Sequence, residues 1–435
     1  MRRLTLVEHE TTPAVRLTRA EREALRGAIP ELTLSPARGL ASGGSRYDVT
    51  AGSWVGVAAA GDLMVEIAPK LPIQNVLFLV SYALDPAVWR AGADVPLQER
   101  DGLLEAMAGL FCAEARRALR YGVLHGYETR EESLAGVRGR VLLEEHARRH
   151  HGRLPPVPVR YDALTVDISE NRVLRSALLR LDRLASRSLT VARQVRHLLA
   201  ALEDVSPADQ RRLPEVRFTP LNERYRRALG LARQILRGGS VEARLGALPA
   251  LACLFDMDRV FEEFVAVALR EALGLTEWAF PRGGRGKRLA LDRRGALPLE
   301  PDLSWWDGAR CAFVGDVKYK RTAAGEHADL YQLLAYATAA DVPGGLLVYA
   351  ASDVPGDTAR AHDVRHAGKS LHVAALDLAQ PPEHLLRQIE RLAERVRALR
   401  GAPAGVPIDI RRSAHYAMPP MRSRANLQSQ DMRSP

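Results

Sequence analysis

The spacing of hydrophobic positions divides the chain into regions with different periodicities. Up to about residue 95, short stretches with a period of two alternate with short helical stretches. The run WVGVAAAGDLMVEIAP (54–69) predicts two strands around Gly61-Asp62. The run PIQNVLFLVSYAL (72–84) predicts a helix opened by Pro72. We therefore expect an N-terminal α+β domain over residues 1–95.

A helical period dominates residues 96–238. A helix is expected from Glu99 to Arg120, and Ser169 is expected to cap the helix in SENRVLRSALLRLDRLAS. The pair Ser206-Pro207 has the cap-then-proline order that opens a helix. Gly238-Gly239-Ser240 ends the helical region and predicts a domain boundary.

Helices and strands alternate beyond this boundary. CLFDMDRVFEEFVAVALREALG (253–274) predicts one long helix. The pattern favours an α/β domain over residues 239–402, with a mixed sheet flanked by helices, and a loose tail over 403–435. Its predicted elements are strands in LTEWAF, KRLALD, LPLEPDLSWW and RCAFVGDVKYK, a helix in HADLYQLLAYATAA, strands in GGLLVYA and SLHVAALDL, and a helix in PPEHLLRQIERLAERVRALRG.

Composition narrows the class of protein. The chain has 435 residues, 47% of them hydrophobic, so it can bury a large core. Its net charge of +10 favours an acidic partner such as nucleic acid. The three cysteines are far apart and form no Cys-x-x-Cys pair, which argues against a disulfide framework and a zinc or iron–sulfur site. The N-terminus lacks a signal peptide, and the apolar run VLFLVSYAL is too short to span a bilayer, so we expect a cytoplasmic protein with no membrane association.

Lysine is scarce, which makes its positions informative. Of the 62 lysine and arginine residues, only Lys70, Lys287, Lys318, Lys320 and Lys369 are lysine. Two of these five lie in GDVKYK. Arginine presents a broad planar fork, whereas lysine is a compact point charge that can reach a single oxygen in a tight site. The sequence therefore predicts a site in GDVKYK that arginine cannot serve.

The residues around these lysines suggest phosphodiester chemistry. In a strand, Asp316, Lys318 and Lys320 share one face, and Asp302 converges on them if its strand is a neighbour. Two carboxylates suit Mg²⁺, with Mn²⁺ as a substitute, and the ammonium of Lys318 can orient a water molecule and stabilise a charged phosphate. Lys320 is expected to contact a phosphate at the edge. The alternative is an ordinary surface ion pair between Asp316 and Lys318.

Residues on two helices are further candidates. Gln332 and Tyr336 are four positions apart and share a helix face. They either join the site or form the polar edge of a core helix. Glu262 and Glu263 form an acidic pair, of which one could face the site, although a solvated helix face is the expected alternative for both.

These motifs resemble a known nuclease family. The order of helix, strands, PD…DxK and a helix with QxxxY is similar to the PD-(D/E)xK nuclease fold. LFDMDRVFEEFV, EPDLSWW, GDVKYK and DLYQLLAYA resemble the McrC family, the nuclease subunits of the McrBC 5-methylcytosine restriction system. APKLPIQNVLFLVSYA, GVRGRVLLEEH and VDISENRVLRSALLRL resemble further blocks of that family.

The resemblance implies a Mg²⁺-dependent DNA endonuclease subunit. It implies catalytic roles for Asp302, Asp316, Lys318, Gln332 and Tyr336, and a metal site of Asp302, Asp316 and Glu262. It also implies an McrB-like AAA+ GTPase partner docked on residues 96–238, because the chain has no nucleotide-binding motif of its own. Dimerisation is one route to cutting both strands. The alternatives are a non-catalytic activator of an AAA+ partner and a stand-alone RecB-like nuclease.

Overall fold

The computed structural model of the protein describes ten stretches of the chain. They are residues 2–37, 46–86, 102–151, 155–184, 188–209, 212–237, 250–284, 287–320, 327–351 and 360–400. Three features predicted from the sequence lie outside them: the start of the helix expected at Glu99, the boundary at Gly238-Gly239-Ser240 and the tail over 403–435.

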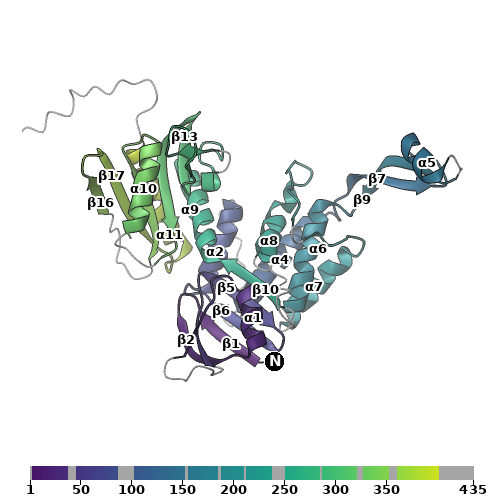
Figure 1. The fold of residues 1–435 in the computed structure, drawn as a ribbon, viewed down its shortest axis with the longest axis horizontal. Coiled ribbons are helices and arrows are strands. Elements are labelled where there is room, and N and C mark those ends of the chain that lie inside the picture. The colour runs from purple at the N-terminus through teal and green to yellow at the C-terminus, as the bar shows by residue number, and fades with distance from the viewer. Residues whose placement is uncertain are drawn as a thin grey trace, which may run out of the picture.

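Two small sheets and helix α1 form the N-terminal part, at the bottom of Figure 1. The sheets have the strand orders β1-β6-β5-β10 and β2-β4-β3. The strand pair predicted around Gly61-Asp62 is confirmed as β5 and β6. Helix α1 (Arg19–Ala28) begins with a capping box between Thr18 and Glu21 and packs on the larger sheet. The strand bounds are β1 Arg2–Val7, β2 Thr11–Arg16, β3 Thr33–Pro36, β4 Arg46–Thr50, β5 Trp54–Ala60, β6 Leu63–Ala68 and β10 Ala250–Asp256.

Strand β10 corrects the prediction of one long helix over 253–274. Cys253 lies opposite Val57 in antiparallel register with β5, and helix α9 (Met257–Leu273) begins only after Asp256. The Asp256 carboxylate caps this helix by accepting a hydrogen bond from the Arg259 backbone N–H at 3.3 Å. A short apolar run suits a strand or a buried helix equally well. This run forms a strand because pairing with β5 provides hydrogen-bond partners for the backbone N–H and C=O groups of both segments.

A layer of helices follows the N-terminal sheets. The elements are α2 Ile73–Leu84, α4 Leu103–Leu119, α6 Ser169–Leu184, α7 Leu189–Ala201, a 3₁₀ turn at Glu223–Tyr225, and α8 Arg226–Arg237. Ser169 is the first residue of its helix, close to the predicted cap. The prediction of a helix that opens at Ser206-Pro207 is wrong. The described residues there are not helical, and the Ser206 N–H donates to Asp167 Oδ1 at 2.8 Å.

A long arm projects from the helical layer, at the right of Figure 1. It consists of the antiparallel strands β7 (Gly126–Leu134) and β9 (Val157–Thr165), the short β8 (Arg140–Val141) and helix α5 (Leu143–His150). No strand is predicted here from the sequence. Residues of β7 alternate between exposed and half-buried, but those on the half-buried side are mostly polar, so β7 lacks the apolar alternation that marks a half-buried strand.

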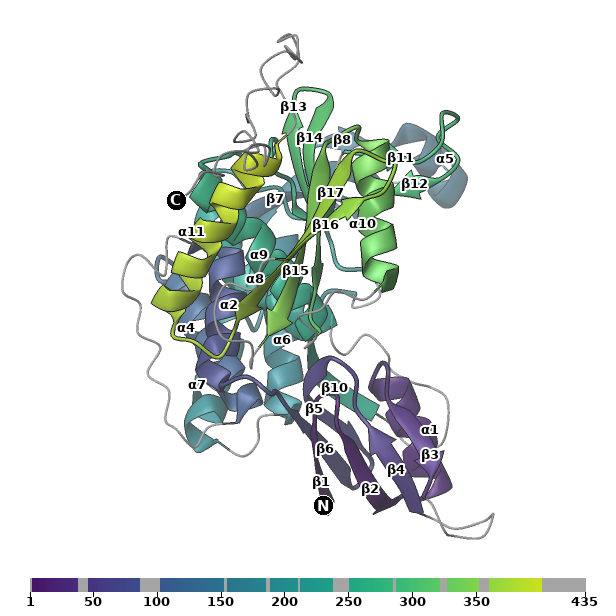
Figure 2. The same ribbon diagram turned by 90° about the vertical axis from the view of Figure 1, so that its left-hand side faces the viewer.

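A five-stranded mixed sheet forms the C-terminal part, in the order β13-β14-β15-β17-β16. Strands β14, β15 and β17 are parallel, and the outer strands β13 and β16 are antiparallel to their neighbours. Helices α9 and α11 cover one face and α10 the other (Figure 2). The bounds are β11 Leu289–Ala290, β12 Pro298–Leu299, β13 Leu303–Asp307, β14 Arg310–Lys318, α10 His327–Ala339, β15 Gly344–Ala351, β16 Arg360–Val364, β17 Lys369–Asp377 and α11 Pro382–Leu399.

These elements confirm the predicted α/β class with a mixed sheet flanked by helices. One strand prediction is wrong: LTEWAF (275–280) forms turns after α9 ends at Gly274 in the left-handed conformation. The strand predicted in KRLALD shrinks to two residues, Leu289–Ala290. Within the described stretches, no helix is long and apolar enough to cross a lipid bilayer.

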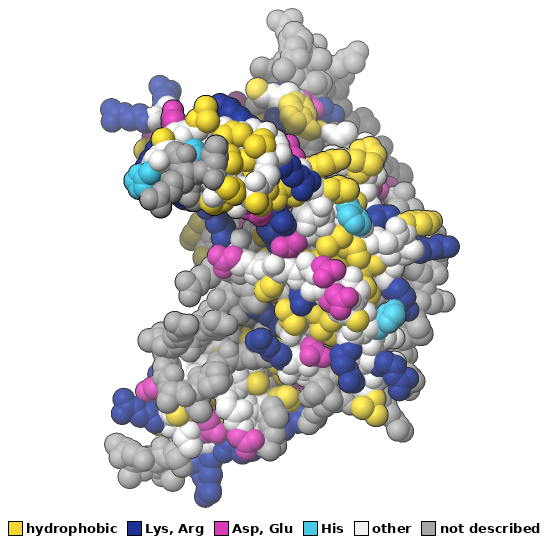
Figure 3. Space-filling model, turned by 90° about the vertical axis from the view of Figure 1, so that its right-hand side faces the viewer, with side chains coloured by type: hydrophobic (Ala, Val, Ile, Leu, Met, Phe, Trp, Pro, Cys, Tyr) yellow, Lys and Arg dark blue, Asp and Glu magenta, His cyan; other side chains and the backbone are white. Residues whose placement is uncertain are grey.

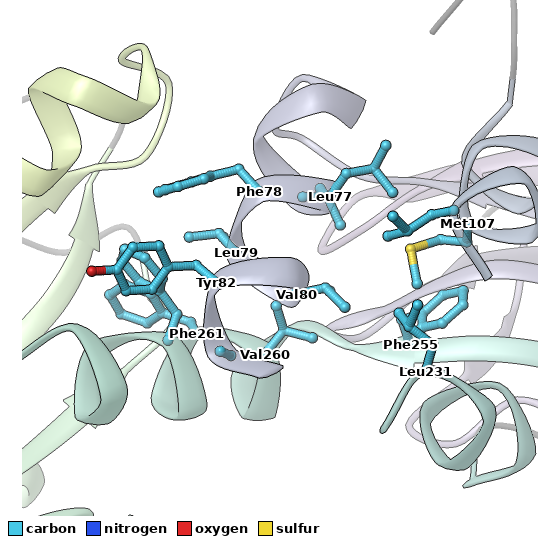
Figure 4. Close-up of a cluster of buried hydrophobic side chains, with 14 of the residues drawn as sticks. Leu77, Phe78, Leu79, Val80, Tyr82, Met107, Leu231, Phe255, Val260 and Phe261 are labelled. Carbon is cyan, nitrogen blue, oxygen red and sulfur yellow. The ribbon is translucent and has the colours of Figure 1, made fainter. Parts of the chain in front are cut away.

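Helix α2 joins the parts into one hydrophobic core. Phe78, Leu79 and Tyr82 lie on the side of Phe261 of α9, whereas Leu77 faces the helical layer (Figure 4). Phe78 and Tyr82 both contact the ring of Phe264, with ring centroids 5.5 and 5.6 Å apart. Because α2 is buried on both sides, the N-terminal part and the C-terminal sheet share a continuous packed interior.

Candidate active site

The two predicted aspartates meet at one end of the C-terminal sheet. Asp302 precedes β13, whose first residue Leu303 pairs with Gly315, so Asp302 lies beside Asp316 of β14. Asp302 Oδ2 accepts a hydrogen bond from the Val317 N–H at 2.9 Å. The Asp316 side chain is 1% exposed. The sheet register therefore brings together two carboxylates that are 14 positions apart.

Burial and the nearby charge of Asp316 keep a proton on Asp302. Burial raises the pKa of Asp302 to about 9, and the charge of Asp316, a hydrogen bond with it and the charge of Glu262 act in the same direction. The hydrogen bond from Val317 opposes them. The Asp302 carboxyl therefore keeps its proton at neutral pH. A cation bound between Asp302 and Asp316 would replace that proton.

Lys318 completes the group. Its Nζ lies 2.5 Å from Asp316 Oδ2, on the face of β14 that the two-residue period predicted. Burial opposes the ammonium charge, but the carboxylates of Asp316 and Asp302 outweigh burial and raise the pKa of Lys318. The lysine is therefore a charged donor beside the aspartate pair. Since Asp316 is buried, this ion pair is not the exposed surface pair that was the alternative.

Helix α9 turns Glu262 toward the same group. Burial raises its pKa to about 7; the Lys318 charge opposes this, and the charges of Asp256, Asp258 and Asp316 add to it. The side chain is half-buried, which corrects the expectation of a solvated helix face. Glu263 points to other partners: it accepts from Arg259 at 2.9 Å and from Gln234 at 3.2 Å.

A cleft opens next to the aspartate pair. It has a volume of about 340 Å³ and is lined by acidic side chains and by the basic Arg259 and Arg282. Its acidic residues are Asp256, Asp258, Glu262, Glu263 and Asp302. Among the residues that the structure describes, no three carboxylate, histidine or cysteine side chains are grouped closely enough to hold a metal ion. A metal-binding role for Glu262 therefore stays a prediction. Asp302 and Asp316 lie next to each other in the sheet.

Gln332 and Tyr336 of α10 lie behind the aspartates. Gln332 Nε2 donates to Tyr336 Oη at 2.6 Å, and the Tyr336 hydroxyl donates to the Glu300 carbonyl at 3.3 Å. Burial raises the pKa of Tyr336 to about 12, so its hydroxyl stays protonated. Glu300 lies two positions before Asp302. These contacts suit a role in holding the segment that carries the aspartate.

Asp329, which is buried at the start of α10, is a residue near the site that was not predicted from the sequence. Its Oδ2 accepts from Tyr349 Oη at 2.7 Å and lies 3.4 Å from Lys320 Nζ. An aspartate in a first helical turn is a common cap residue, so the sequence carried no signal for this contact. Lys320 is partly exposed at the edge of the site, where a phosphate contact was predicted.

Comparisons with known proteins agree with this fold. Residues 49–350 match the family described as McrBC 5-methylcytosine restriction system component. The structure is similar to a chain in a half-complex from a tetradecameric assembly of Thermococcus gammatolerans McrB AAA+ hexamers with bound McrC. That likeness has a TM-score of 0.53 and 17% identity and covers 91% of this chain and 100% of that one. A chain of the T. gammatolerans McrBC complex gives a TM-score of 0.40 and 20% identity, covering 62% of this chain and 88% of that one. The comparison with curated proteins gives no match.

Proposed function

This chain belongs to the McrBC 5-methylcytosine restriction system component family, and on that premise we propose that it is the Mg²⁺-dependent DNA endonuclease subunit of a McrBC-like restriction system. The observation that carries the proposal is the group of the buried Asp316 and the half-buried Asp302 and Lys318 at the end of the mixed sheet. All three are intact and close together, as hydrolysis of a phosphodiester requires.

The aspartate pair fits a hard divalent cation. Asp302 and Asp316 would hold Mg²⁺, or Mn²⁺ in its place, with water molecules completing the shell. Burial and the charge of Asp316 raise the pKa of Asp302, and a cation bound at the pair would offset both effects. The bound ion would supply a water of lowered pKa and neutralise charge on the scissile phosphate.

Lys318 acts on the reacting phosphate. Its ammonium donates to the attacking water or to a phosphate oxygen while the new P–O bond forms and the leaving oxygen departs. The ion pair with Asp316 at 2.5 Å fixes the position of this donor before the substrate arrives. Glu262, with its pKa raised to about 7, can exchange a proton near neutral pH. Gln332 and Tyr336 support Asp302 through the Glu300 carbonyl.

An AAA+ GTPase partner fits the remaining part of the chain. The solved relative contains McrC bound to McrB AAA+ hexamers. We assign the docking surface to the arm of β7, β9 and α5, which projects from the helical layer and away from the aspartate pair (Figure 1). Tyr127 and Leu143 on the arm are 77% and 73% exposed. Figure 3 looks onto this side of the molecule and shows hydrophobic side chains gathered on the arm.

Two alternatives predict different outcomes in one assay. A non-catalytic activator would stimulate the partner without cutting DNA, and a stand-alone nuclease would cut DNA without the partner or GTP. The Asp302–Asp316–Lys318 group favours cutting over activation alone. The family match covers the helical layer and strands β13 to β15 of the C-terminal sheet, which favours a partnered nuclease over a stand-alone one.

The test is cleavage of cytosine-methylated plasmid by the full chain, its AAA+ partner, GTP and Mg²⁺. We expect double-strand cleavage that Asp316→Asn abolishes while GTPase stimulation persists. Asp363→Asn is the matched control, because Asp363 is exposed on the edge strand β16 of the same sheet. GTPase stimulation with no cleavage by the wild-type chain would overturn the nuclease assignment. Equal cleavage without partner and GTP would overturn the partnered one.

A further inference from the structure

A buried carboxylate joins the N-terminal part to the catalytic strand. Glu8 follows β1 and is 0% exposed. Its Oε1 accepts two hydrogen bonds, from the Lys70 backbone N–H at 2.7 Å and from Tyr319 Oη at 2.9 Å. The second bond spans the junction between the N-terminal sheet and the C-terminal sheet.

Burying this carboxylate is energetically unfavourable, which indicates a specific role for it. Its second oxygen, Oε2, has no hydrogen-bond partner among the described residues. Leaving a buried polar atom unpaired is unfavourable, and an apolar residue of similar size would avoid it. Burial also raises the pKa of Glu8, against the effects of its two hydrogen bonds and the nearby charges of His9 and Lys70. Hydrophobic packing alone would favour an apolar residue at position 8, so it does not explain the glutamate.

Tyr319 links this carboxylate to two catalytic elements. It is the first residue after β14, between Lys318 and Lys320, and alternation points it to the opposite face from both lysines. Its ring packs near Phe261 of α9, with centroids 6.0 Å apart, and near His9, with centroids 6.2 Å apart. Phe261 is the neighbour of Glu262. One side chain therefore contacts the region of the catalytic lysine, the helix of the glutamate and the N-terminal part.

The junction around this bond is open. A cleft of about 620 Å³ lies between the two parts. It is lined by residues of the N-terminal part, among them Glu8, His9 and Lys70, and by Tyr319 and Lys320 after the catalytic strand. Because this cleft borders the bond, packed side chains cover only part of the end of β14 on this side. A directed hydrogen bond then has a large effect on where the chain lies.

We propose that Tyr319 is a positioning residue, through which Glu8 of the N-terminal part holds the end of the catalytic strand in the arrangement that cleavage requires. The inference rests on the proposed nuclease function. The bond from Tyr319 to Glu8 anchors the backbone immediately after Lys318, and the ring sets the distance to α9. The N-terminal part thereby shapes a site to which it contributes no catalytic side chain.

The test compares two tyrosines that each lose one hydroxyl. Tyr319→Phe keeps the ring and removes the bond to Glu8. Tyr225→Phe is the matched control, because Tyr225 is also buried and its hydroxyl accepts from the Leu124 N–H at 2.9 Å, in the helical layer. We expect Tyr319→Phe to lower single-turnover cleavage about tenfold at saturating Mg²⁺, with the KM for DNA and the GTPase stimulation unchanged. Tyr225→Phe should leave the cleavage rate unchanged.

A double-mutant cycle identifies Glu8 as the partner. Glu8→Leu removes the acceptor and should slow cleavage to the same extent as Tyr319→Phe, and the double variant should be no slower than either. Glu8→Gln keeps a carbonyl acceptor and should restore most of the rate. Effects that multiply in the double variant, or equal rates for Tyr319→Phe and Tyr225→Phe, would overturn the proposal.

A second readout does not depend on activity. Hydrogen–deuterium exchange of peptides covering residues 314–320 should rise in Tyr319→Phe and stay at the wild-type level in Tyr225→Phe. If the wild-type chain fails to cut DNA, the nuclease proposal falls, while this measurement still decides whether Tyr319 holds the strand end. Unchanged exchange in Tyr319→Phe would overturn the positioning role even in an active nuclease.

Discussion

Lys318 Nζ and Asp316 Oδ2 are 2.5 Å apart at the end of a strand that is otherwise buried on both faces. The aspartate is shielded from solvent and the lysine is only partly exposed. A broad planar cation would have to displace neighbours to make the same contact. This geometry gives a physical reason for lysine at position 318 of a chain whose usual cation is arginine.

The first prediction is that Lys318→Arg separates binding from cleavage. Charge is retained, so DNA affinity, which sums over many cations, should change little. The point donor beside the aspartates is lost, and we expect single-turnover cleavage to fall by about 100-fold or more. Lys369→Arg is the matched control, because Lys369 Nζ donates to the Val342 carbonyl at the opposite end of the parallel strands. Cleavage by Lys318→Arg within a few-fold of wild type would return the pair to an ordinary structural role.

The second prediction concerns the choice of metal. Cleavage should require Mg²⁺ or Mn²⁺ and stop in EDTA, because the carboxylate pair offers few ligands and leaves the rest of the shell to ordered water. Ca²⁺ should occupy the pair without supporting cleavage, since its geometry is longer and looser. Competition by Ca²⁺ in an assay at fixed Mg²⁺ measures this. Robust cutting in EDTA would exclude the metal mechanism.

The third prediction is that metal affinity rises with pH. The pKa values of Asp302 and Glu262 are raised to about 9 and about 7, so both carboxyls hold protons at mildly acidic pH. A protonated carboxyl is a poor ligand, and binding must release a proton. The half-saturating Mg²⁺ concentration should fall between pH 6 and 9, by up to about tenfold per unit for each proton released. Titration calorimetry in two buffers of different ionisation enthalpy counts the protons. A flat profile would contradict the raised pKa values.

The fourth prediction concerns the stability of the metal-free protein. Because the Asp302 pKa is higher in the folded chain than in the unfolded one, the folded state binds more protons. The free energy of unfolding should therefore fall as pH rises from about 4 to 9. Asp302→Asn removes this loss and should raise the Tm at pH 8 by a few degrees, while abolishing cleavage. Thermal melts at pH 5 and pH 8 in EDTA test it; a variant that is less stable than wild type at pH 8 would refute it.

The fifth prediction assigns partner binding to the arm. Tyr127→Ser combined with Leu143→Ser removes two exposed apolar side chains and should leave the fold intact. We expect half-maximal GTPase stimulation to need about a tenfold higher concentration of the double variant than of the wild-type chain. Aromatic and large apolar side chains contribute most of the binding free energy at interfaces. Leu189→Ser is the matched control: Leu189 is 76% exposed but begins α7, outside the arm. If the double variant and Leu189→Ser stimulate the partner alike, the partner binds elsewhere.

Local patterns in the sequence were enough to predict strand β14, helix α10 and the fold class. Asp316 and Lys318 share a face because side chains alternate along any strand, and this local rule holds before the chain folds. The helix of Gln332 and Tyr336 and the strands β5 and β6 follow local periodicity in the same way. The scarcity of lysine also marked Lys318 without any knowledge of neighbours.

Other features depend on residues that are far apart in the sequence and form only when those residues pack together. The apolar run at Cys253–Phe255 became a strand because the edge of β5 was there to pair with it. Glu262 rather than Glu263 turned toward the aspartates because Arg259 and Gln234 engage Glu263. Glu8 and Tyr319 form a hydrogen bond across 311 positions. No local propensity encodes such contacts, because the free energy of burial and pairing is set only when the separate parts of the chain pack together.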